Sequence, residues 1–451
     1  MILRQVFGPR GKHSVRNRIA AHLGGDLANA QTFTHKVKTV DRVNLHLVLD
    51  RWLERDRPTS ALIGFSGDNY RRVGLADIAV NNALTVAPIQ REPLERAPGE
   101  TLHCVTHGVY LLRHGGRPIA VMLYEEQLPV TTRWLDVMAV DAEVARAAFQ
   151  QLLDDSQRDN VYKGKVISLA AGGRCGEPEI AIQFHELPAA ARGQVVLPAD
   201  VMTVLERNVL GLLHHADALR RSGRSTRHGV LLHGPPGTGK TLAVRYLASA
   251  ARGHTVILLS GRQLGLIRES CQIARLLAPS IVVLEDVDLI ALHREENEHT
   301  VVLHELMDEM DGLGAKTACI FLLTTNRPEV IEPALSGRPG RIDQAIAFPL
   351  PDADCRRRLF DLYGTGINLS DVNLDRWVVQ TDGVSPAFIE ELLRKAALFA
   401  AERHETSPQA NGQPLPLELR DEDLANAVRE LVFFGGEVTQ RLLGYKHDTL
   451  A

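Results

Sequence analysis

Short, continuous hydrophobic runs that end in polar residues recur in the second half of the chain. They read GVLLHG, TVILLS, IVVLED and CIFLLTTN, and segments with helical periodicity separate them. Such runs are typical of strands buried on both faces, and their alternation with helices predicts a parallel sheet wrapped by crossover helices. From residue 351 onward the helical pattern dominates. We therefore predict an α/β unit followed by a helical one.

The first half of the chain has a different pattern. Two β-rich apolar runs flank the turn sequence RHGG at residues 113–116 and predict a hairpin, whereas residues 41–56 predict a helix. An α+β domain is therefore expected before the segment at residues 185–201, whose small residues and prolines mark a domain boundary. The predicted divisions are an N-terminal α+β domain 1–190, an α/β subdomain 191–350, a helical subdomain 351–436 and a tail 437–451.

Composition narrows the class of protein. The chain has 451 residues, of which 45% are hydrophobic and 24% are charged, and its formal net charge is -4. These are globular proportions without the basic field that nucleic-acid binding requires. The 5 cysteines are widely spaced and form no C-x-x-C pair, which argues against disulfides and structural zinc. Because no apolar run reaches the roughly 18 residues of a membrane span and the N-terminus turns polar too soon for a signal peptide, we expect a cytoplasmic protein without membrane contact.

The sequence GPPGTGKT at residues 234–241 lies directly between a predicted strand and a predicted helix. It satisfies the phosphate-loop pattern G-x-x-x-x-G-K-[ST] in its required setting. Glycines let backbone N–H groups surround phosphate oxygens, Lys240 can reach the β and γ phosphates, and Thr241 can bind Mg²⁺. The pattern predicts that ATP is held by Gly234, Pro235, Pro236, Gly237, Thr238, Gly239, Lys240, Thr241 and Leu242.

Two carboxylates follow the strand-like run IVVL at residues 281–284. In a phosphate-loop fold, an acid at the end of a neighbouring strand holds Mg²⁺, and the next acid orients and deprotonates the attacking water. We therefore predict that Glu285 is a metal residue together with Thr241, and that Asp286 is catalytic.

Five segments occur in order and together resemble the AAA ATPase module, over roughly residues 195–435. They are GVLLHGPPGTGKT, APSIVVLEDVDLI, ELMDEMDGLG, FLLTTNRPEVIEPAL and GRPGRID. The resemblance implies an α/β P-loop NTPase fold with a C-terminal helical lid. It also implies roles for particular residues: Lys240 and Thr241 as the Walker A pair, Glu285 and Asp286 as the Walker B pair, Asn326 as sensor 1, Arg338 and Arg341 as arginine fingers for a neighbouring subunit, and Asp311 and Gly312, followed by Leu313, as the inter-subunit signalling turn.

The resemblance implies a ring, expected to be a hexamer, that hydrolyses ATP with Mg²⁺ and remodels, disassembles or translocates a protein or protein complex. Residues 1–190 lie outside the resemblance and are expected to select the substrate or an adaptor. Two alternatives stay open at this point. The first alternative is an ATP-gated structural or regulatory scaffold with little turnover. The second is a nucleic-acid motor, which the charge balance disfavours.

Three departures from the family pattern bear on mechanism. The order Glu285 then Asp286 reverses the common Asp-Glu order and is similar to that of the mitochondrial AAA translocases of the Rieske-protein type. The segment SGRQLGLIRES at 260–270 has no aromatic residue for gripping a threaded chain, so Leu266 and Ile267 are expected to be buried. Pro386-Ala387 stands where the family often has Gly-Ala, and Ser385 and Pro386 are expected to begin a helix.

Two other kinds of site find no support in the sequence. HELMD at residues 304–308 lacks the second histidine of H-E-x-x-H, which argues against a zinc protease site. The spacing of the histidines suggests no metal site, and GPRGKH at residues 8–13 is expected to be an exposed basic turn. The sequence therefore predicts neither a zinc protease site nor a histidine metal site.

Overall fold

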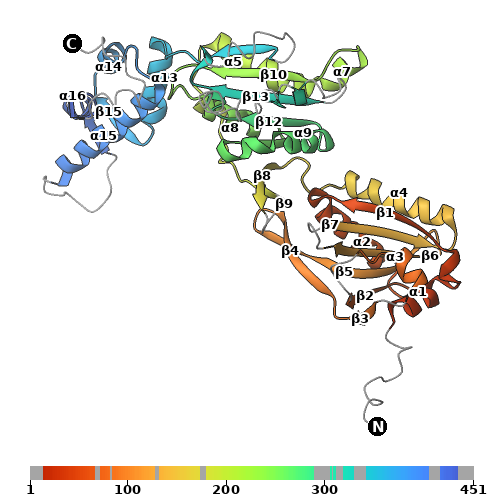
Figure 1. Ribbon diagram of the computed structural model, residues 1–451. Helices are drawn as coiled ribbons and strands as arrows, with labels where there is room; N and C mark the ends of the chain where they lie inside the picture. The colour runs from red at the N-terminus through yellow and green to blue at the C-terminus, as the bar shows by residue number, and fades with distance from the viewer. Residues whose placement is uncertain are drawn as a thin grey trace, which may run out of the picture. The chain divides into compact units, whose positions relative to one another are not determined.

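The chain divides into two compact units, Met1–His185 and Glu186–Ala451. Figure 1 shows the computed structural model, coloured from red at the N-terminus to blue at the C-terminus. The structure describes residues 14–66, 72–81, 84–126, 132–172, 179–288, 305–306, 308–310, 318–329, 342–405 and 417–434. In the described part of the chain, no helix has both the length and the apolar character needed to cross a membrane.

The first unit is built on an antiparallel sheet with the strand order β1-β7-β6-β5-β2-β3, in which β4 also pairs with β5. Gly115 and Gly116, both at positive φ, form the turn of the β5–β6 hairpin, which confirms the hairpin predicted around RHGG. Outside this sheet, β8 and β9 form an antiparallel hairpin. The strands are β1 Gln31–Val37, β2 Ala61–Ser66, β3 Thr85–Ala87, β4 Gln90–Ala97, β5 Glu100–His114, β6 Arg117–Glu126, β7 Thr132–Ala139, β8 Val166–Gly172 and β9 Glu179–Phe184.

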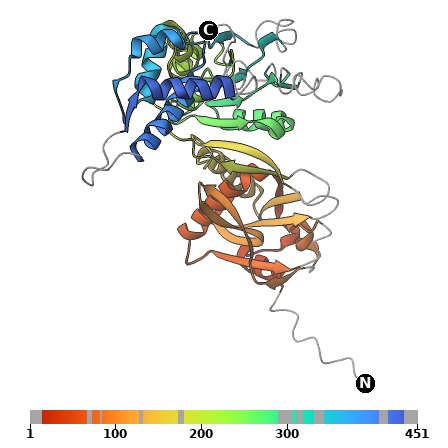
Figure 2. The same cartoon turned by 90° about the vertical axis from the view of Figure 1, so that its left-hand side faces the viewer.

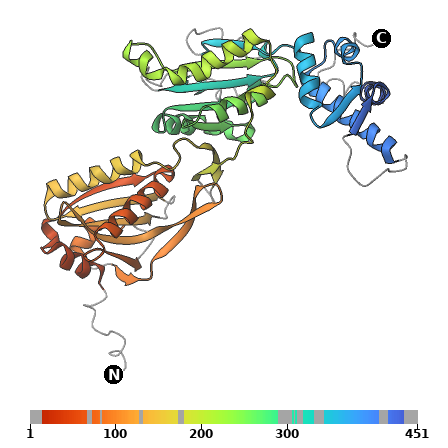
Figure 3. The same cartoon turned by 180° about the vertical axis from the view of Figure 1, so that it is seen from behind.

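Helices cover both faces of this antiparallel sheet (Figures 1 and 3). Tyr110 and Leu112 of β5 pack in one core with α2 and α4, whereas the alternate residues Val109 and Leu111 pack in the other core with α1 and α3. The helix predicted at residues 41–56 is confirmed as α2. The helical elements are α1 Val15–Leu23, α2 Arg42–Arg55, α3 Leu75–Val80, α4 Ala142–Arg158, and the 3₁₀ turns Leu27–Asn29 and Thr39–Asp41.

The second unit contains a parallel sheet in which β14, β10, β13, β12 and β11 are neighbours in that order. The predicted apolar runs are confirmed as β10, β11, β12 and β13, and the strands β12 and β13 are buried throughout, as strands between helical layers should be. The elements are the 3₁₀ turn Arg192–Gln194, α5 Ala199–Glu206, a π-helical segment Arg207–Gly211, α6 Leu212–His214, α7 Ala216–Arg221, β10 His228–His233, α8 Lys240–Ala250, β11 Thr255–Leu259, the 3₁₀ segment Gly261–Leu266, α9 Ile267–Leu276, β12 Ser280–Leu284, β13 Cys319–Thr325 and β14 Gln344–Ala347.

The chain then continues into a mainly helical segment, drawn in blue in Figures 1 and 2. Its own apolar core includes Phe360, Trp377, Phe388 and Leu392. A short parallel pair, β15 with β16, accompanies the helices, and the sequence pattern, in which helices dominate, did not predict it. The elements are α13 Ala353–Tyr363, β15 Ile367–Asp371, α14 Leu374–Gln380, α15 Pro386–Glu405, β16 Leu417–Arg420, α16 Asp421–Arg429 and a π-helical turn Glu430–Phe434.

Candidate functional site

The loop between β10 and α8 has the backbone conformation that the phosphate-loop pattern predicts. Gly237 and Gly239 adopt φ values of 75° and 92°, in the left-handed region that favours glycine. At Gly234 a side chain is excluded by space, because a Cβ atom would lie 2.3 Å from the backbone oxygen of Phe348. The loop therefore folds tightly at the N-terminus of α8, where backbone N–H groups and the helix dipole favour an anion.

Lys240 is the first residue of α8 and turns back over the loop. Its Nζ donates hydrogen bonds to the backbone oxygens of Gly234 and Pro235, each at 2.8 Å. Burial lowers the pKa of Lys240 to about 8, although the carboxylates of Asp286 and Asp288 oppose this shift. A buried ammonium group that rests on neutral carbonyls is stabilised further by an anion. The arrangement fits the β and γ phosphates of a nucleotide.

Thr241 and Glu285 meet at the carboxyl end of β12. The Thr241 side chain is exposed and hydrogen-bonds to the Glu285 carboxylate. Burial raises the pKa of Glu285, and the nearby Asp286 raises it further. A hydroxyl oxygen beside a carboxylate is a suitable donor set for Mg²⁺. The two residues predicted to bind the metal therefore lie together, and a cation would stabilise the charged form of Glu285.

Asp286 lies next to Asn326, the residue predicted as sensor 1. Asn326 Nδ2 donates a hydrogen bond to Asp286 Oδ1 at 3.2 Å, and the Asp286 backbone N–H donates to Thr324 Oγ1 at 3.0 Å. Asp286 has a φ of 51°, an uncommon value for a residue other than glycine. The hydrogen bonds from both sides stabilise this conformation, which presents an exposed carboxylate at the end of the strand.

Asp288 is a site residue to which the sequence interpretation assigned no role. Its side chain is buried, and Oδ1 accepts hydrogen bonds from Thr325 Oγ1 at 2.9 Å and from the Asn326 backbone N–H at 3.2 Å. These bonds attach the end of β13 to the segment after β12. The signal available in the sequence was a second acid, Asp288, separated from Asp286 by one residue after a buried strand. Spacing alone could not show that the second acid faces the next strand.

The helical segment contacts the phosphate loop directly. The Ala387 backbone N–H donates to the Gly237 oxygen at 3.2 Å. Ser385 Oγ accepts a hydrogen bond from the Phe388 N–H at 3.2 Å, which confirms that Ser385 caps α15 and that Pro386 begins it. A Cβ atom at Gly237 would lie 2.9 Å from Ser385 Oγ and 3.0 Å from Ala387 Cβ. Glycine at position 237 therefore permits this close approach.

The remaining predicted residues have different outcomes. Thr238 is buried and donates from Oγ1 to the Pro235 oxygen at 2.9 Å, whereas Pro236 is exposed and Leu242 is half-buried. Leu266 and Ile267 are buried, as expected. The other predicted residues lie outside the described part of the chain; they are Arg338, Arg341, Asp311, Gly312 and Leu313.

Comparisons with known proteins match the part of the chain that contains this loop. The family model described as "ATPase family associated with various cellular activities (AAA)" matches residues 230–350. The ATP-dependent zinc metalloprotease FtsH 2 of Sphaerobacter thermophilus is 34% identical over 53% of this chain and 38% of its own length. The ATPase family gene 2 protein homolog A of Homo sapiens is 38% identical over 50% of this chain and 26% of its own. The 26S proteasome regulatory subunit 4 homolog of Dictyostelium discoideum is 35% identical over 45% of this chain and 49% of its own.

The fold and the loop geometry define residues 230–350 as an α/β P-loop NTPase domain. The chain thus contains an AAA ATPase domain at these residues and is similar to AAA ATPases over this part of its length. The chain spans less than half the length of these three relatives. A solved structure from work described as "Structural Basis for Katanin Self-Assembly" is similar over 56% of this chain and 88% of that chain, with 26% identity and a TM-score of 0.43.

Proposed function

We propose that this protein hydrolyses ATP and uses the turnover to remodel a protein or protein complex. The observation that carries the proposal is the meeting of groups from three neighbouring strands at one edge of the sheet. Lys240 follows β10, Glu285 and Asp286 follow β12, and Asn326 follows β13. An ammonium, a metal-binding pair and an exposed carboxylate beside an amide are the parts that phosphoryl transfer to water needs.

Each residue has a distinct task in this proposal. Lys240 and the loop N–H groups would hold the phosphates, while Thr241 and Glu285 would hold Mg²⁺. Bound Mg²⁺ would neutralise charge on the phosphate oxygens. Asp286 orients the attacking water and accepts its proton, and Asn326 fixes the Asp286 carboxylate through the 3.2 Å hydrogen bond. Because aspartate is one methylene shorter than the usual glutamate, this positioning by Asn326 matters more here than for a longer acid.

We further propose that the chains form a hexameric ring, in which Arg338 and Arg341 complete the ATP site of a neighbouring subunit. An arginine that stabilises transition-state charge in another subunit has a use only in an assembly. The helical segment 351–436 would act as a lid, since α15 already touches the phosphate loop through Ala387 and Gly237. The N-terminal unit would select the protein substrate or an adaptor.

The test mixes two inactive variants. Arg341→Ala subunits bind ATP but fail to activate their neighbours, and Lys240→Ala subunits bind no ATP but still donate an intact Arg341. Mixed rings, identified by native mass spectrometry, should recover part of the phosphate release that neither variant shows alone. No recovery in verified mixed rings would contradict an arginine that acts between subunits. Wild-type protein that binds ATP tightly and releases no phosphate would instead identify an ATP-gated scaffold.

A further inference from the structure

The first unit contains a cavity that lies between two strands that do not pair with each other. Its volume is 310 Å³. Residues of β4, of β9, of the start of α2 and of the turn before it line the cavity, together with Tyr162. Phe184 of β9 stacks on Tyr162 with 5.5 Å between ring centroids, which fixes this side of the cavity.

The cavity follows the edges of the two strands. Successive residues of a strand point to opposite faces, so a cavity on one face would be lined by alternate residues. Here consecutive residues line it: Glu92, Pro93, Leu94 and Glu95 of β4, and Ala181 and Ile182 of β9. In the described part of the first unit, β4 pairs with β5 alone and β9 pairs with β8 alone. The cavity therefore faces two open strand edges.

The hydrogen bonds of β9 show which of its backbone groups face the cavity. The His185 N–H donates to the Val166 oxygen at 2.9 Å, so this opposed pair is hydrogen-bonded. The register between β8 and β9 continues without a shift. Because hydrogen-bonded and non-hydrogen-bonded pairs alternate in an antiparallel ladder, Ile180, Ile182 and Phe184 direct their N–H and C=O groups away from β8. These groups offer a ladder for one more strand.

β9 is the better of the two edges for pairing. β4 carries Pro93, which lacks an N–H, and charged residues such as Arg91 and Arg96, features that protect an edge from added strands. β9 reads EIAIQF and contains no proline, lysine or arginine. Its apolar residues Ile180 and Ile182 are only partly buried. An edge of this kind without protection marks a place for β-strand addition.

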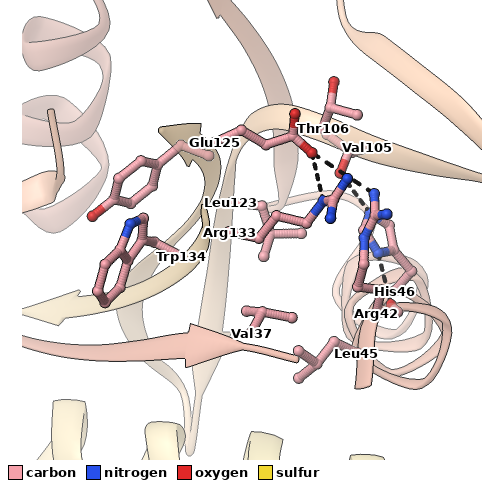
Figure 4. A pocket seen from close by; sticks show the side chains of 11 residues that line it. Val37, Arg42, Leu45, His46, Val105, Thr106, Leu123, Glu125, Arg133 and Trp134 are labelled. Atoms are coloured by element: carbon pink, nitrogen blue, oxygen red, sulfur yellow. Dashed lines mark hydrogen bonds and ion pairs between the residues drawn. The ribbon is translucent and has the colours of Figure 1, made fainter. Parts of the chain in front are cut away.

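The charges at the cavity select among possible occupants. Among the described residues that line it, Arg42 is a cation and Glu92 and Glu95 are carboxylates. Arg42 is already paired with Glu92, and Glu125 lies 3.9 Å from Arg42 and 2.7 Å from Arg133. In Figure 4, dashed lines join the Glu125 carboxylate to both guanidinium groups. Arg42 is thus neutralised, and the lining has a net negative formal charge that favours a basic residue over an acidic one.

We propose that an extended polypeptide segment adds as a strand to the open edge of β9, with an apolar side chain in the cavity and a basic residue close to Glu95. Val43, Leu94, Tyr162 and Ile182 supply the apolar contacts, and the N–H and C=O groups of Ile180, Ile182 and Phe184 supply the backbone ladder. This inference deepens the proposed substrate or adaptor role of the N-terminal unit. It requires neither ATP nor turnover.

The experiment measures binding of a fluorescein-labelled peptide of alternating valine and threonine, with a lysine at each end, by anisotropy on the full chain. Ile182→Pro removes one donor at the open edge and leaves the hydrogen bonds to β8 in place, because position 182 faces away from β8. We expect it to weaken binding by about tenfold or more, whereas Ile182→Val, which keeps the N–H, should bind as the wild type does. A peptide that is N-methylated at alternate backbone positions lacks donors for the ladder. It should bind to the wild type as weakly as the unmodified peptide binds to Ile182→Pro, and this comparison does not depend on the folding of a variant.

Charge and nucleotide controls separate this inference from the proposed function. Glu95→Lys should weaken binding of the lysine-flanked peptide, and replacing the lysines with glutamates should weaken its binding to the wild type. Lys240→Ala should bind the peptide normally. The inference would be overturned if the lysine-flanked peptide did not bind to the wild type. It would also be overturned if Ile182→Pro and Ile182→Val bound this peptide equally and the wild type bound the N-methylated and unmodified peptides equally. Phosphate release measured on the same samples reports on the proposed function independently.

Discussion

Asn326 and Asp286 are joined by a hydrogen bond of 3.2 Å between Nδ2 and Oδ1, across the ends of two strands that are neighbours in the sheet. Asn326 is held in turn by Asp288, which accepts from its backbone N–H and from Thr325 Oγ1. The two aspartates therefore accept from different groups of Asn326: Asp286 from the side-chain amide and Asp288 from the backbone N–H. Asp286 is exposed and available for chemistry, whereas the buried Asp288 positions Asn326.

The role of Asp288 can be tested with two substitutions. Asp288→Ala removes the acceptor and leaves two donors without their partner, so we expect kcat to fall by about tenfold to a hundredfold while ATP affinity is retained. Asp288→Asn keeps an oxygen acceptor and should restore most of the rate. Steady-state phosphate release and ATP binding by calorimetry provide the two measurements. Equal rates for both variants would contradict a positioning role that depends on the acceptor.

The pKa of Lys240 predicts how ATP binding depends on pH. Burial lowers this pKa to about 8, and a bound phosphate favours the charged ammonium. Affinity for ATP should therefore fall as the pH rises above about 8. For the protein without ligand the sign is opposite: the unfolded chain binds this proton more tightly, so Lys240 makes the free energy of unfolding increase with pH between about 8 and 10.5.

Calorimetric titrations between about pH 7 and 9.5 measure this effect on ATP binding. Lys240→Arg keeps its charge over this range and should show a flatter pH dependence, while Lys240→Ala should bind ATP weakly at every pH without unfolding. An affinity that is constant across the range in the wild type would show that the charge of the Lys240 ammonium group does not contribute to ATP binding.

Gly237 offers a test of the contact between the phosphate loop and α15. A Cβ atom at this position meets Ser385 and Ala387 within 3.0 Å, whereas a Cβ atom at Gly253, after α8, meets nothing within 4 Å. Both glycines have positive φ, at 75° and 81°, so Gly253→Ala is a matched control for backbone strain alone. We expect Gly237→Ala to weaken ATP binding by about tenfold and Gly253→Ala to leave it unchanged. Similar ATP affinities in the two variants would exclude the contact as a determinant of binding.

Much of the second unit could be predicted because its signals are local. A buried strand of a parallel sheet is apolar on both faces, so β12 and β13 are visible as continuous runs, and the glycines of the loop 234–239 are fixed by backbone geometry. Because the strands that precede these residues lie near one another in the sheet, Thr241 contacts Glu285 and Asn326 contacts Asp286. The order of the motifs in the sequence had led us to expect these residues in one site.

Other features depend on contacts between residues far apart in the sequence. The role of Asp288 follows from its partners on β13, which spacing does not reveal. The short strands β15 and β16 are separated by two helices, and their pairing has no local signal. The open edge of β9 is defined by the strands that pair with it and by its register with β8. Such features follow from the tertiary fold rather than from the pattern of the segment itself.

The measurement that tests the account most directly compares Asp286→Asn with the wild type in phosphate release and in ATP binding with Mg²⁺. Loss of the acid that accepts the proton should reduce turnover by about a hundredfold or more while ATP and Mg²⁺ still bind, and Glu285→Gln should in addition weaken the dependence on Mg²⁺. Turnover close to wild type in Asp286→Asn, with Glu285→Gln alone inactive, would contradict the assignment and reverse the roles of the two acids.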